Sequence, residues 1–427
     1  MSSYSELRYF SDRMLVSDLR FADNSVFELL HETGRGFVNN RDTVHFCGLV
    51  SHPDVGSVFF LPRESITTDT SINLATAKLT MKALSKFAAE TSKREFESNS
   101  LDGDFSILSV IKHITDDFIK LGIYTQRSRL GGREHGKPDW TKTIQQETPI
   151  LNFRGQPIYS DIHTTVLARR SDAILAQIQT AILREIITSH GWWIAGLGTR
   201  KHELFKINAT RIPRALWEKT LTSILPSLYS SRSIFLAEYL RRYLRETRGF
   251  DTGKNIFGIN DFHTVWETVL RKAIVRSETD SMRNWNSELP KPVYLANGDD
   301  KIGVASRGMQ TDIILEIDDA YVIVDAKYYS AKSASDAPGW SDIVKQMFYE
   351  LALHEVLGID DKRKRNIKNV FVFPNQNNGG PLRCVEMKLS DGSQTSRIFP
   401  KIDCIYVSIT EALNSYVSGT PSIQISL

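Results

Sequence analysis

The chain has 427 residues, which is long enough for two or three domains with sizeable hydrophobic cores. Its formal net charge is only +3, so global basicity is excluded as a means of binding nucleic acid, and any such binding requires a local basic patch. Three widely separated cysteines, a polar opening and the absence of any run of 18 apolar residues indicate a cytoplasmic protein without structural zinc, a signal peptide or a membrane-spanning segment.

The first region, residues 1 to 125, is expected to combine strands and helices. Two apolar runs, Val44–Val50 and Val58–Arg63, flank the turn-forming segment Pro53–Gly56 and predict a pair of strands. Helices are expected next, over Leu74–Ala89 and Ile107–Leu121. This α+β region is a candidate for DNA recognition or for binding a partner protein.

The second region, residues 126 to 250, is expected to be mainly helical after a basic, glycine-containing linker at Gln126–Arg133. Amphipathic helices are predicted from Ser171 and from about Ser233, because isoleucine and leucine side chains recur there at helical spacing. This region is a further candidate for DNA binding.

Basic side chains that could contact phosphates form three groups. They are Arg127, Arg129, Arg133 and Lys137 in the linker; Arg241, Arg242, Arg245 and Arg248 on the later helix; and Lys362, Arg363, Lys364, Arg365 and Lys368. Each neutralised phosphate adds a salt-sensitive increment to affinity. We favour the linker group because Gly131 and Gly132 let the backbone approach phosphate closely, and the alternative for each group is a solvated charged face.

In the third region, residues 251 to 427, two carboxylates and a lysine surround two short apolar runs in the pattern D-x12-D-A-K. Val322–Val324 predict a buried strand that ends at Asp325 and Lys327, which share one face, and Asp312 approaches them across a turn at Asp318–Asp319. Two carboxylates about 4 Å apart repel by roughly 4 kcal/mol at an effective dielectric constant of about 20, and a divalent cation would remove that penalty. The cluster therefore predicts a hard-metal site with an ammonium beside it. The alternative is a strand capped by a surface ion pair.

This pattern resembles the PD-(D/E)XK nuclease superfamily, in which D…DxK spans adjacent strands of a mixed sheet flanked by helices. The resemblance implies an α/β fold and Mg²⁺ held by Asp312, Asp325 and the backbone carbonyl of Ala326, with Mn²⁺ as a substitute. It also implies that Lys327 orients or activates the attacking water and stabilises charge at phosphorus. The expected order of helix, strand, strand, helix and a last strand at Asn369–Pro374 agrees with the nuclease core.

Two helix residues have counterparts in the superfamily. Glu267, on a helix over Asp261–Leu270, matches an acid that often precedes the first catalytic strand, which makes it a candidate catalytic residue and metal ligand. Gln346, on a helix over Ser341–Leu357, resembles the glutamine of McrC-type and RecB-type nucleases, although Tyr349 follows it after three residues rather than four. The alternatives are a solvated helix glutamate and a surface glutamine.

A series of segments along the chain resembles the LlaJI-type restriction endonuclease family: the N-terminal strand pair, Ile119–Tyr124, Gly136–Ile144, Trp266–Glu267 and Asp325–Tyr329. The resemblance implies a DNA restriction subunit that works with an McrB-like AAA+ GTPase, with the nuclease in the C-terminal region and methyltransferases that protect the host. The chain itself has no GxxxxGK[ST] motif, so nucleotide hydrolysis is expected in the partner.

The favoured hypothesis is a Mg²⁺-dependent endonuclease that hydrolyses double-stranded DNA within an anti-phage restriction system. Base recognition is expected in residues 1 to 250, because a nuclease core has little surface left for it, and double-strand cleavage would require a homodimer or repeated engagement. The alternative is a non-cleaving recognition or adaptor subunit on a decayed nuclease fold, and a more distant one is a nuclease acting on RNA. Retention of both carboxylates and the lysine favours cleavage.

Overall fold

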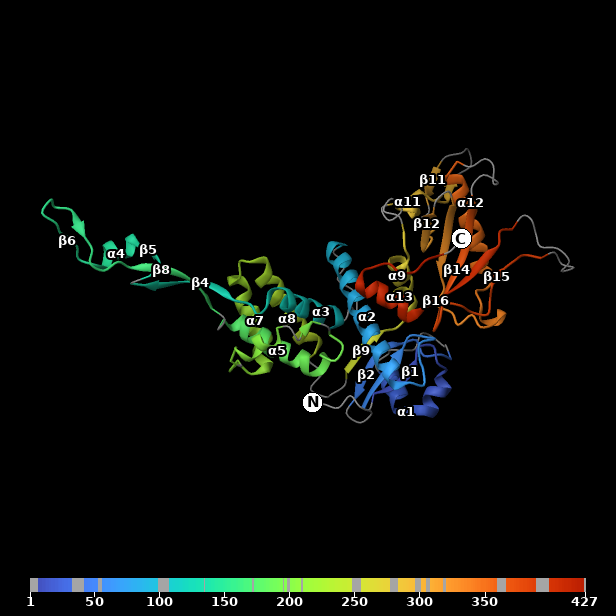
Figure 1. Cartoon of the computed structure of the whole chain (residues 1–427), viewed down its shortest axis with the longest axis horizontal. Coiled ribbons are helices and arrows are strands. Elements are labelled where there is room, and N and C mark those ends of the chain that lie inside the picture. Colours follow the sequence, from blue (N-terminus) through green and yellow to red (C-terminus); the bar gives the residue numbers. More distant parts are fainter. Residues whose placement is uncertain are drawn as a thin grey trace. The chain divides into compact units, whose positions relative to one another are not determined.

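The computed structural model of the chain describes residues 7–32, 42–52, 56–98, 107–133, 135–170, 173–194, 196–197, 200–208, 210–247, 255–276, 283–295, 301–304, 308–317, 320–358, 366–388 and 399–425. The chain forms two compact units, whose elements are labelled in Figure 1. One unit is Asp104–Gly249, and the other joins Ser2–Gly103 to Phe250–Leu427. The structure therefore groups most of the first expected region with the third, where we expected three separate regions.

A four-stranded sheet forms the N-terminal part of the second unit. Its order is β1 (Arg8–Ser11), β3 (Gly56–Leu61), β2 (Cys47–His52) and β9 (Asn255–Ile259), with β1 parallel to β3 and the other pairs antiparallel. Strands β2 and β3 confirm the expected strand pair. Helix α1 (Val16–Glu32) buries Leu19, Val26 and Leu30 in one core with Phe46 and Phe60, and helix α2 (Thr70–Ser98) contacts β2, β3 and β9.

Strand β9 belongs to this sheet although it comes far later in the chain. Gly48 and Gly258 face each other in the β2–β9 ladder. A Cβ atom on Gly48 would lie 2.2 Å from the Phe257 carbonyl oxygen, and one on Gly258 would lie 2.4 Å from the Cys47 carbonyl oxygen. Glycine at both positions lets the two strands approach closely, and this pairing explains why residues 2–103 share a unit with the C-terminal part.

The C-terminal sheet has the strand order β12 (Ile313–Ile317), β13 (Ala320–Ala326), β14 (Asn366–Asn375), β16 (Ile402–Ser408) and β15 (Cys384–Val385). Strands β13, β14 and β16 are parallel, whereas β12 and β15 run antiparallel to their neighbours. Val322, Ile323 and Val324 are fully buried, as expected for a central strand covered on both faces. The chain is therefore a mixed α/β protein.

Helices flank the C-terminal sheet. Helix α12 (Trp340–Val356) connects the parallel strands β13 and β14 and packs Leu353 against Ile314 and Ile323. Helix α9 (His263–Ala273) precedes β12 and β13 in the chain and contacts β13, and α13 (Ile409–Ser418) packs on α9. Helix α11 (Trp285–Glu288) and a hairpin of β10 (Val293–Leu295) and β11 (Lys301–Val304) lie between α9 and β12 in the chain. The order α9, β12, β13, α12, β14 agrees with the expected order.

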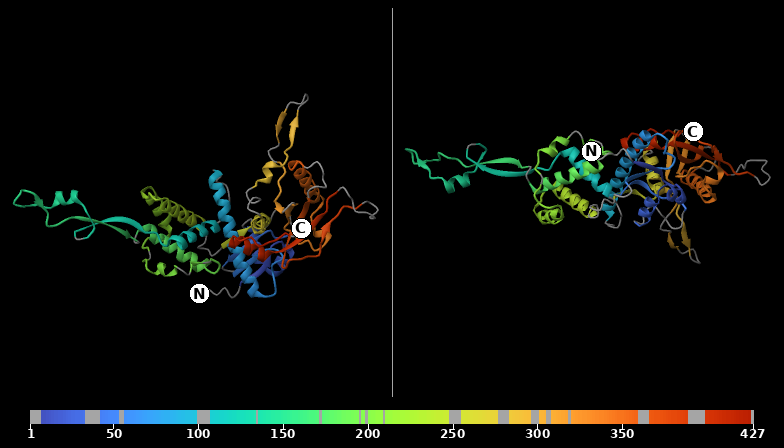
Figure 2. Two further views of the ribbon diagram at one scale, coloured as in Figure 1. Left: turned by 45° about the horizontal axis from the view of Figure 1, so that its top comes forward. Right: turned by 90° about the horizontal axis from the view of Figure 1, so that it is seen from below.

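The other unit contains α3 (Ile107–Leu121), α5 (Ile174–His190), α6 (Lys201–Phe205), α7 (Arg214–Ile224), a 3-10 turn (Leu225–Ser227) and α8 (Ser231–Glu246). The antiparallel strands β4 (Gln126–Gly132) and β8 (Thr164–Arg170), part of a three-stranded sheet with the order β4-β8-β5, extend away from these helices in both views of Figure 2. They lead to β5 (Lys137–Pro138), α4 (Trp140–Gln146), β6 (Ile150–Leu151) and β7 (Pro157–Ile158). We call residues 126–170 the ribbon arm. No helix in the described part of the chain is long and apolar enough to cross a lipid bilayer.

The prediction of a linker at Gln126–Arg133 is wrong, because residues 126–132 form strand β4. They pair antiparallel with Thr164–Arg170, a segment that begins with the β-branched residues Thr164, Thr165 and Val166. Gly131 and Gly132 indicated a loop, but pairing with a partner well downstream overrides that local composition.

Candidate active site

The ends of β12 and β13 bring Asp312 and Asp325 to one edge of the C-terminal sheet. In the antiparallel ladder Ile313 pairs with Val324, so the two aspartates occupy the next positions of the two strands. Asp312 Oδ2 accepts a hydrogen bond from the Ala326 backbone N–H at 2.8 Å. This bond fixes the Asp312 carboxylate against the end of β13.

The Lys327 ammonium lies between two carboxylates. Its Nζ is 2.7 Å from Asp325 Oδ2 and 2.9 Å from Asp342 Oδ1. The Lys327 backbone N–H donates to the Val372 carbonyl at 2.9 Å, which holds the backbone beside β14. Only 15% of the Lys327 side chain and 17% of the Asp325 side chain are exposed, so this pair is not the solvated surface ion pair of the alternative interpretation.

Burial opposes negative charge on the two aspartates. It raises the pKa of Asp325 to about 6; the Lys327 ammonium acts in the opposite direction, and the charge on Asp312 adds to the rise. Burial also raises the pKa of Asp312, against the hydrogen bond from Ala326 and the positive charges of Lys327 and Arg271. The two acids therefore destabilise each other in their charged forms.

Glu267 on α9 is coupled to the same two acids. Burial raises its pKa to about 7, the charges on Asp312 and Asp325 add to the rise, and Arg271 opposes it. The Glu267 side chain is partly buried rather than fully solvated. The structure thus brings Glu267 into the electrostatic surroundings of both aspartates.

The carboxylates have the chemistry of a site for a hard cation. Among the residues that the structure describes, no three His, Cys, Asp or Glu side chains are grouped closely enough to hold a metal ion by themselves. Mg²⁺, however, retains several waters and commonly uses one or two carboxylates. Asp312 and Asp325 are buried acids whose mutual repulsion a divalent cation would relieve, so they fit a two-carboxylate Mg²⁺ site that keeps water ligands.

Comparison with known sequences gives the family of the chain. The sequence model of the LlaJI restriction endonuclease family matches residues 46–387. The chain belongs to this family. The matched range contains Glu267, Asp312, Asp325, Lys327 and Gln346, so every candidate catalytic residue lies within the LlaJI match.

A Bacillus subtilis (strain 168) protein, the Type II restriction enzyme BsuMI component YdjA, is similar to this LlaJI-family chain. The two are 21% identical over 292 residues, which make up 66% of this chain and 57% of the relative. The chain therefore spans little more than half the length of this curated relative.

Two solved assemblies from Thermococcus gammatolerans show weak structural similarity to the LlaJI-family chain. One is a half-complex of McrB AAA+ hexamers with bound McrC, with 13% identity, a TM-score of 0.38, and coverage of 96% of this chain and 98% of that one. The other is an McrBC complex, with 14% identity, a TM-score of 0.28, and coverage of 62% and 85%. These TM-scores are too low to assign a fold.

Gln346 of the LlaJI-family chain lies in the interior of the protein. Its side chain is 1% exposed, and Nε2 donates to the Ile323 carbonyl at 2.8 Å. The alternative interpretation from the sequence, that Gln346 is a surface residue, is therefore wrong. Tyr349 on the same helix donates its hydroxyl hydrogen to the Gln310 carbonyl at 2.7 Å, two residues before Asp312.

Asp342 is a residue of the LlaJI-family site that the sequence pattern did not indicate. Gly339 caps the helix that carries Asp342, and the Asp342 carboxylate contacts Lys327. An acid in the first turn of the helix that follows DxK is the signal that could have drawn attention to it.

Most of the described basic candidates for phosphate contact already have acidic partners in the LlaJI-family chain. The nitrogen-to-oxygen distances are 3.0 Å for Arg241–Glu238, 2.7 Å for Arg242–Glu246, 2.7 Å for Arg245–Glu218 and 3.5 Å for Arg133–Glu147. Each arginine would exchange a carboxylate for a phosphate, which reduces the net gain. Lys137 is exposed on β5.

Other members of the basic groups lie outside the described residues. These are Arg248, residues 362–365, and the side chains of Arg127 and Arg129, whose backbone belongs to β4. DNA contact by the three groups stays a prediction.

Proposed function

We propose that the chain is a Mg²⁺-dependent DNA endonuclease subunit of an anti-phage restriction system. The observation that carries this proposal is the convergence of Asp312, Asp325 and Lys327 at one edge of a sheet, in a member of a restriction endonuclease family. For residues 251–427 we propose a fold of the PD-(D/E)XK type. The mixed sheet, with α9 before β12 and α12 between β13 and β14, supports that assignment.

Asp312, Asp325 and the backbone carbonyl of Ala326 would hold Mg²⁺, Glu267 is a proposed further ligand, and Mn²⁺ is expected to substitute. When bound, the ion supplies a more acidic water and neutralises charge on the phosphate. Lys327 keeps its charge because carboxylates contact it, and its ammonium is placed to orient water or to stabilise phosphate oxygens.

For Gln346 we propose a supporting role rather than contact with substrate. Its amide donates to the backbone of β13 two residues before Asp325, from inside the core. The bond fixes the distance between α12 and β13. Since α12 also carries Asp342, this distance affects how well Asp342 reaches Lys327.

Double-stranded DNA is the proposed substrate, with bases recognised by residues 1 to 250, and an McrB-like AAA+ GTPase is the proposed motor partner. A homodimer would supply a second active site for the opposite strand. The ribbon arm offers a surface suited to a protein partner, because exposed apolar side chains gather on it. They are Trp140, Ile144, Ile150, Leu151, Phe153 and Ile158.

Cleavage of unmethylated plasmid DNA with Mg²⁺, with and without the nucleotide-hydrolysing partner, tests the proposed function. Asp325→Ala and Lys327→Ala should abolish cleavage and leave folding and DNA binding nearly unchanged, and chelation of Mg²⁺ should stop the wild-type reaction. The control is a second Asp–Lys pair, formed by Asp403 on β16 and by Lys401 just before that strand, whose charged atoms are 2.7 Å apart.

Lys401→Ala and Asp403→Ala should cleave like the wild type, because this pair is more exposed than the candidate site. Cleavage that persists in chelator would contradict the proposal. DNA binding without cleavage in every combination would favour the adaptor alternative.

A further inference from the structure

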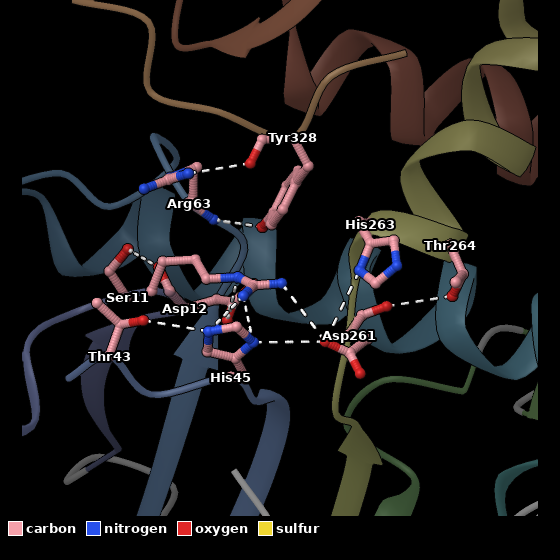
Figure 3. A network of polar contacts seen from close by, with 10 residues as sticks. Ser11, Asp12, Thr43, His45, Arg63, Asp261, His263, Thr264 and Tyr328 are labelled. Atoms are coloured by element: carbon pink, nitrogen blue, oxygen red, sulfur yellow. Dashed lines mark hydrogen bonds and ion pairs between the residues drawn. The ribbon is translucent and has the colours of Figure 1, made fainter. Parts of the chain in front are cut away.

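Tyr328, the residue after Lys327, is buried against the N-terminal sheet. Its hydroxyl accepts a hydrogen bond from the Arg63 backbone N–H at 2.7 Å, and its carbonyl accepts one from Arg63 Nη1 at 2.9 Å (Figure 3). Arg63 follows strand β3 by two residues. A single residue beside the N-terminal sheet therefore holds both the side chain and the backbone of Tyr328.

The Tyr328 ring is packed against α9 and between positive charges. Its centroid lies 5.4 Å from that of Phe262 and 6.5 Å from that of Trp266, the neighbour of Glu267. The guanidinium carbons of Arg13 and Arg63 are each 6.0 Å from the ring centroid. These contacts leave the ring little freedom to turn or shift.

A buried acid lies beside the Tyr328 hydroxyl. The Asp12 side chain is 2% exposed, and burial raises its pKa to about 7, while Arg13, the Tyr328 hydroxyl and Arg63 lower it. Burial raises the pKa of Tyr328, and the charged form of Asp12 adds to the rise. A buried acid lowers the stability of the folded state unless neighbouring groups compensate. Apolar packing alone therefore does not explain why Asp12 is placed beside the Tyr328 hydroxyl.

A second group of contacts attaches the same sheet to the start of α9. Arg13 hydrogen-bonds His45, and its Nη2 lies 3.7 Å from Asp261 Oδ1. His45 Nδ1 is 3.4 Å from the same oxygen (Figure 3). Arg13 has a φ of +69°, which is unfavourable for a residue other than glycine and indicates that its surroundings hold it there. Since α9 carries Glu267, the sheet is attached to two of the elements that supply the candidate site.

We infer that Tyr328 and Arg63 are positioning residues for Lys327, and that the N-terminal sheet is a working part of the nuclease site. This inference rests on the proposed function, because it concerns the ammonium assigned there to phosphate chemistry. Arg63 engages the Tyr328 hydroxyl and carbonyl, so Tyr328 acts through the backbone of Lys327 and not on the substrate. A long, flexible lysine side chain reaches a reproducible position only if its backbone is fixed.

The test compares Tyr328→Phe with Tyr321→Phe in the full chain together with its motor partner. Tyr321 is a matched control, since it is a buried tyrosine in β13, the strand that precedes Tyr328, and it donates its hydroxyl hydrogen to Glu316 Oε1 at 2.9 Å rather than bonding Arg63. We expect Tyr328→Phe to lower kcat for plasmid cleavage by about tenfold or more, with the KM for DNA unchanged. Hydrogen exchange at the Lys327 amide should accelerate by a similar factor, while the affinity for Mn²⁺ stays the same. Tyr321→Phe should change none of these quantities.

Arg63→Ala is the second variant. It removes the guanidinium and keeps the backbone N–H that donates to Tyr328, so it should shift kcat and the Lys327 exchange rate in the same direction by a smaller factor. If Tyr328→Phe does not fold, this variant decides the outcome.

Equal behaviour of Tyr328→Phe and Tyr321→Phe would overturn the inference, as would an acceleration of exchange spread over the whole chain. If the wild type cleaves no DNA, the proposed function fails and hydrogen exchange decides the inference alone. Local acceleration at Lys327 then supports the positioning role, and an unchanged rate contradicts it.

Discussion

Asp325 and Asp342 contact Lys327, Glu267 and Asp312 interact with its charge, and burial raises the pKa of Glu267, Asp312 and Asp325. Without a cation, each of those three acids reduces the stability of the folded state when it is charged. Acids in such surroundings are commonly found where a protein binds or reacts with a ligand. A bound divalent cation would attract each of the charged acids and so offset the repulsion between them.

The raised pKa of Glu267 predicts how stability depends on pH. The pKa is about 7 in the folded state and about 4.5 when unfolded, so between these values the folded state binds more protons and the free energy of unfolding falls as pH rises. Glu267→Gln removes this dependence. The difference in free energy of unfolding, variant minus wild type, should therefore be larger at pH 8 than at pH 5.

Urea denaturation of both proteins in chelator, at the two pH values, measures this difference. A relative stability that is the same at pH 5 and pH 8 contradicts the account of Glu267.

Asp342→Asn tests the residue that the sequence pattern did not indicate. It removes one of the two carboxylates that contact the Lys327 ammonium, so cleavage should fall by about tenfold, and Asp342→Glu should recover part of the loss. The control is Asp336→Asn in the 3-10 turn Ala334–Asp336, which precedes α12; the Asp336 carboxylate accepts a hydrogen bond from the Ser333 hydroxyl. If Asp342→Asn cleaves as well as Asp336→Asn, Asp342 is not needed to position Lys327, and Asp325 alone is sufficient.

The side chains that share a strand end could be predicted from the sequence, because strand alternation places Asp325 and Lys327 on one face and the adjacent strand brings Asp312 beside them. The sequence places Asp342 in the first turn of a helix, but its contact with Lys327 could not be predicted, since that contact depends on where the first turn of α12 packs relative to β13. The burial of Gln346 is likewise a tertiary result: its polar side chain bonds a backbone carbonyl that no sequence pattern reveals.

Elements formed by local apolar runs were predicted, and elements formed by distant pairing were not. Strands β2, β3 and β13 each follow from a short run of apolar side chains in the sequence. Strand β9 pairs with β2 although about 200 residues separate the two strands in the sequence, and β4 depends on β8. The single-residue signals for those pairings, glycines at positions 48, 131 and 258, fit loops equally well.

Gly48→Ala tests the pairing of β2 with β9. The added Cβ would meet the Phe257 carbonyl oxygen in a backbone conformation with φ of +145°, so the free energy of unfolding should fall by about 2–4 kcal/mol. Gly56→Ala is the control: its φ is +79°, but nothing lies within 4 Å of its Cβ, and it should cost only about 1 kcal/mol. Urea denaturation measures both losses in the free energy of unfolding. Equal losses for the two substitutions would mean that the close approach of β9 to β2 does not contribute to stability.

For the molecule as a whole, the described surface separates two tasks that the proposed function requires. The acids of the candidate site are mostly buried at a sheet edge, whereas the ribbon arm exposes apolar side chains such as Phe153, which is 92% exposed. An exposed apolar surface is unfavourable in water unless another protein covers it. Catalysis and partner binding are therefore expected to respond to different substitutions.

Substitution of the arm surface tests that separation. Leu151→Ser together with Phe153→Ser should reduce partner-dependent cleavage by about tenfold or more and leave stability and Mn²⁺ affinity unchanged. Phe21→Ser is the control, because Phe21 is equally exposed, at 96%, but lies on α1. Full partner-dependent cleavage by the arm variant would exclude this surface from partner binding.

Binding of Mn²⁺ to the purified chain, measured by electron paramagnetic resonance, tests the central claim most directly, because it asks whether the acids at the ends of β12 and β13 hold a cation. Asp312→Asn and Asp325→Asn should each weaken binding by about tenfold or more, while Asp403→Asn on β16 should bind like the wild type. Wild-type affinity in both Asp312→Asn and Asp325→Asn would contradict the account.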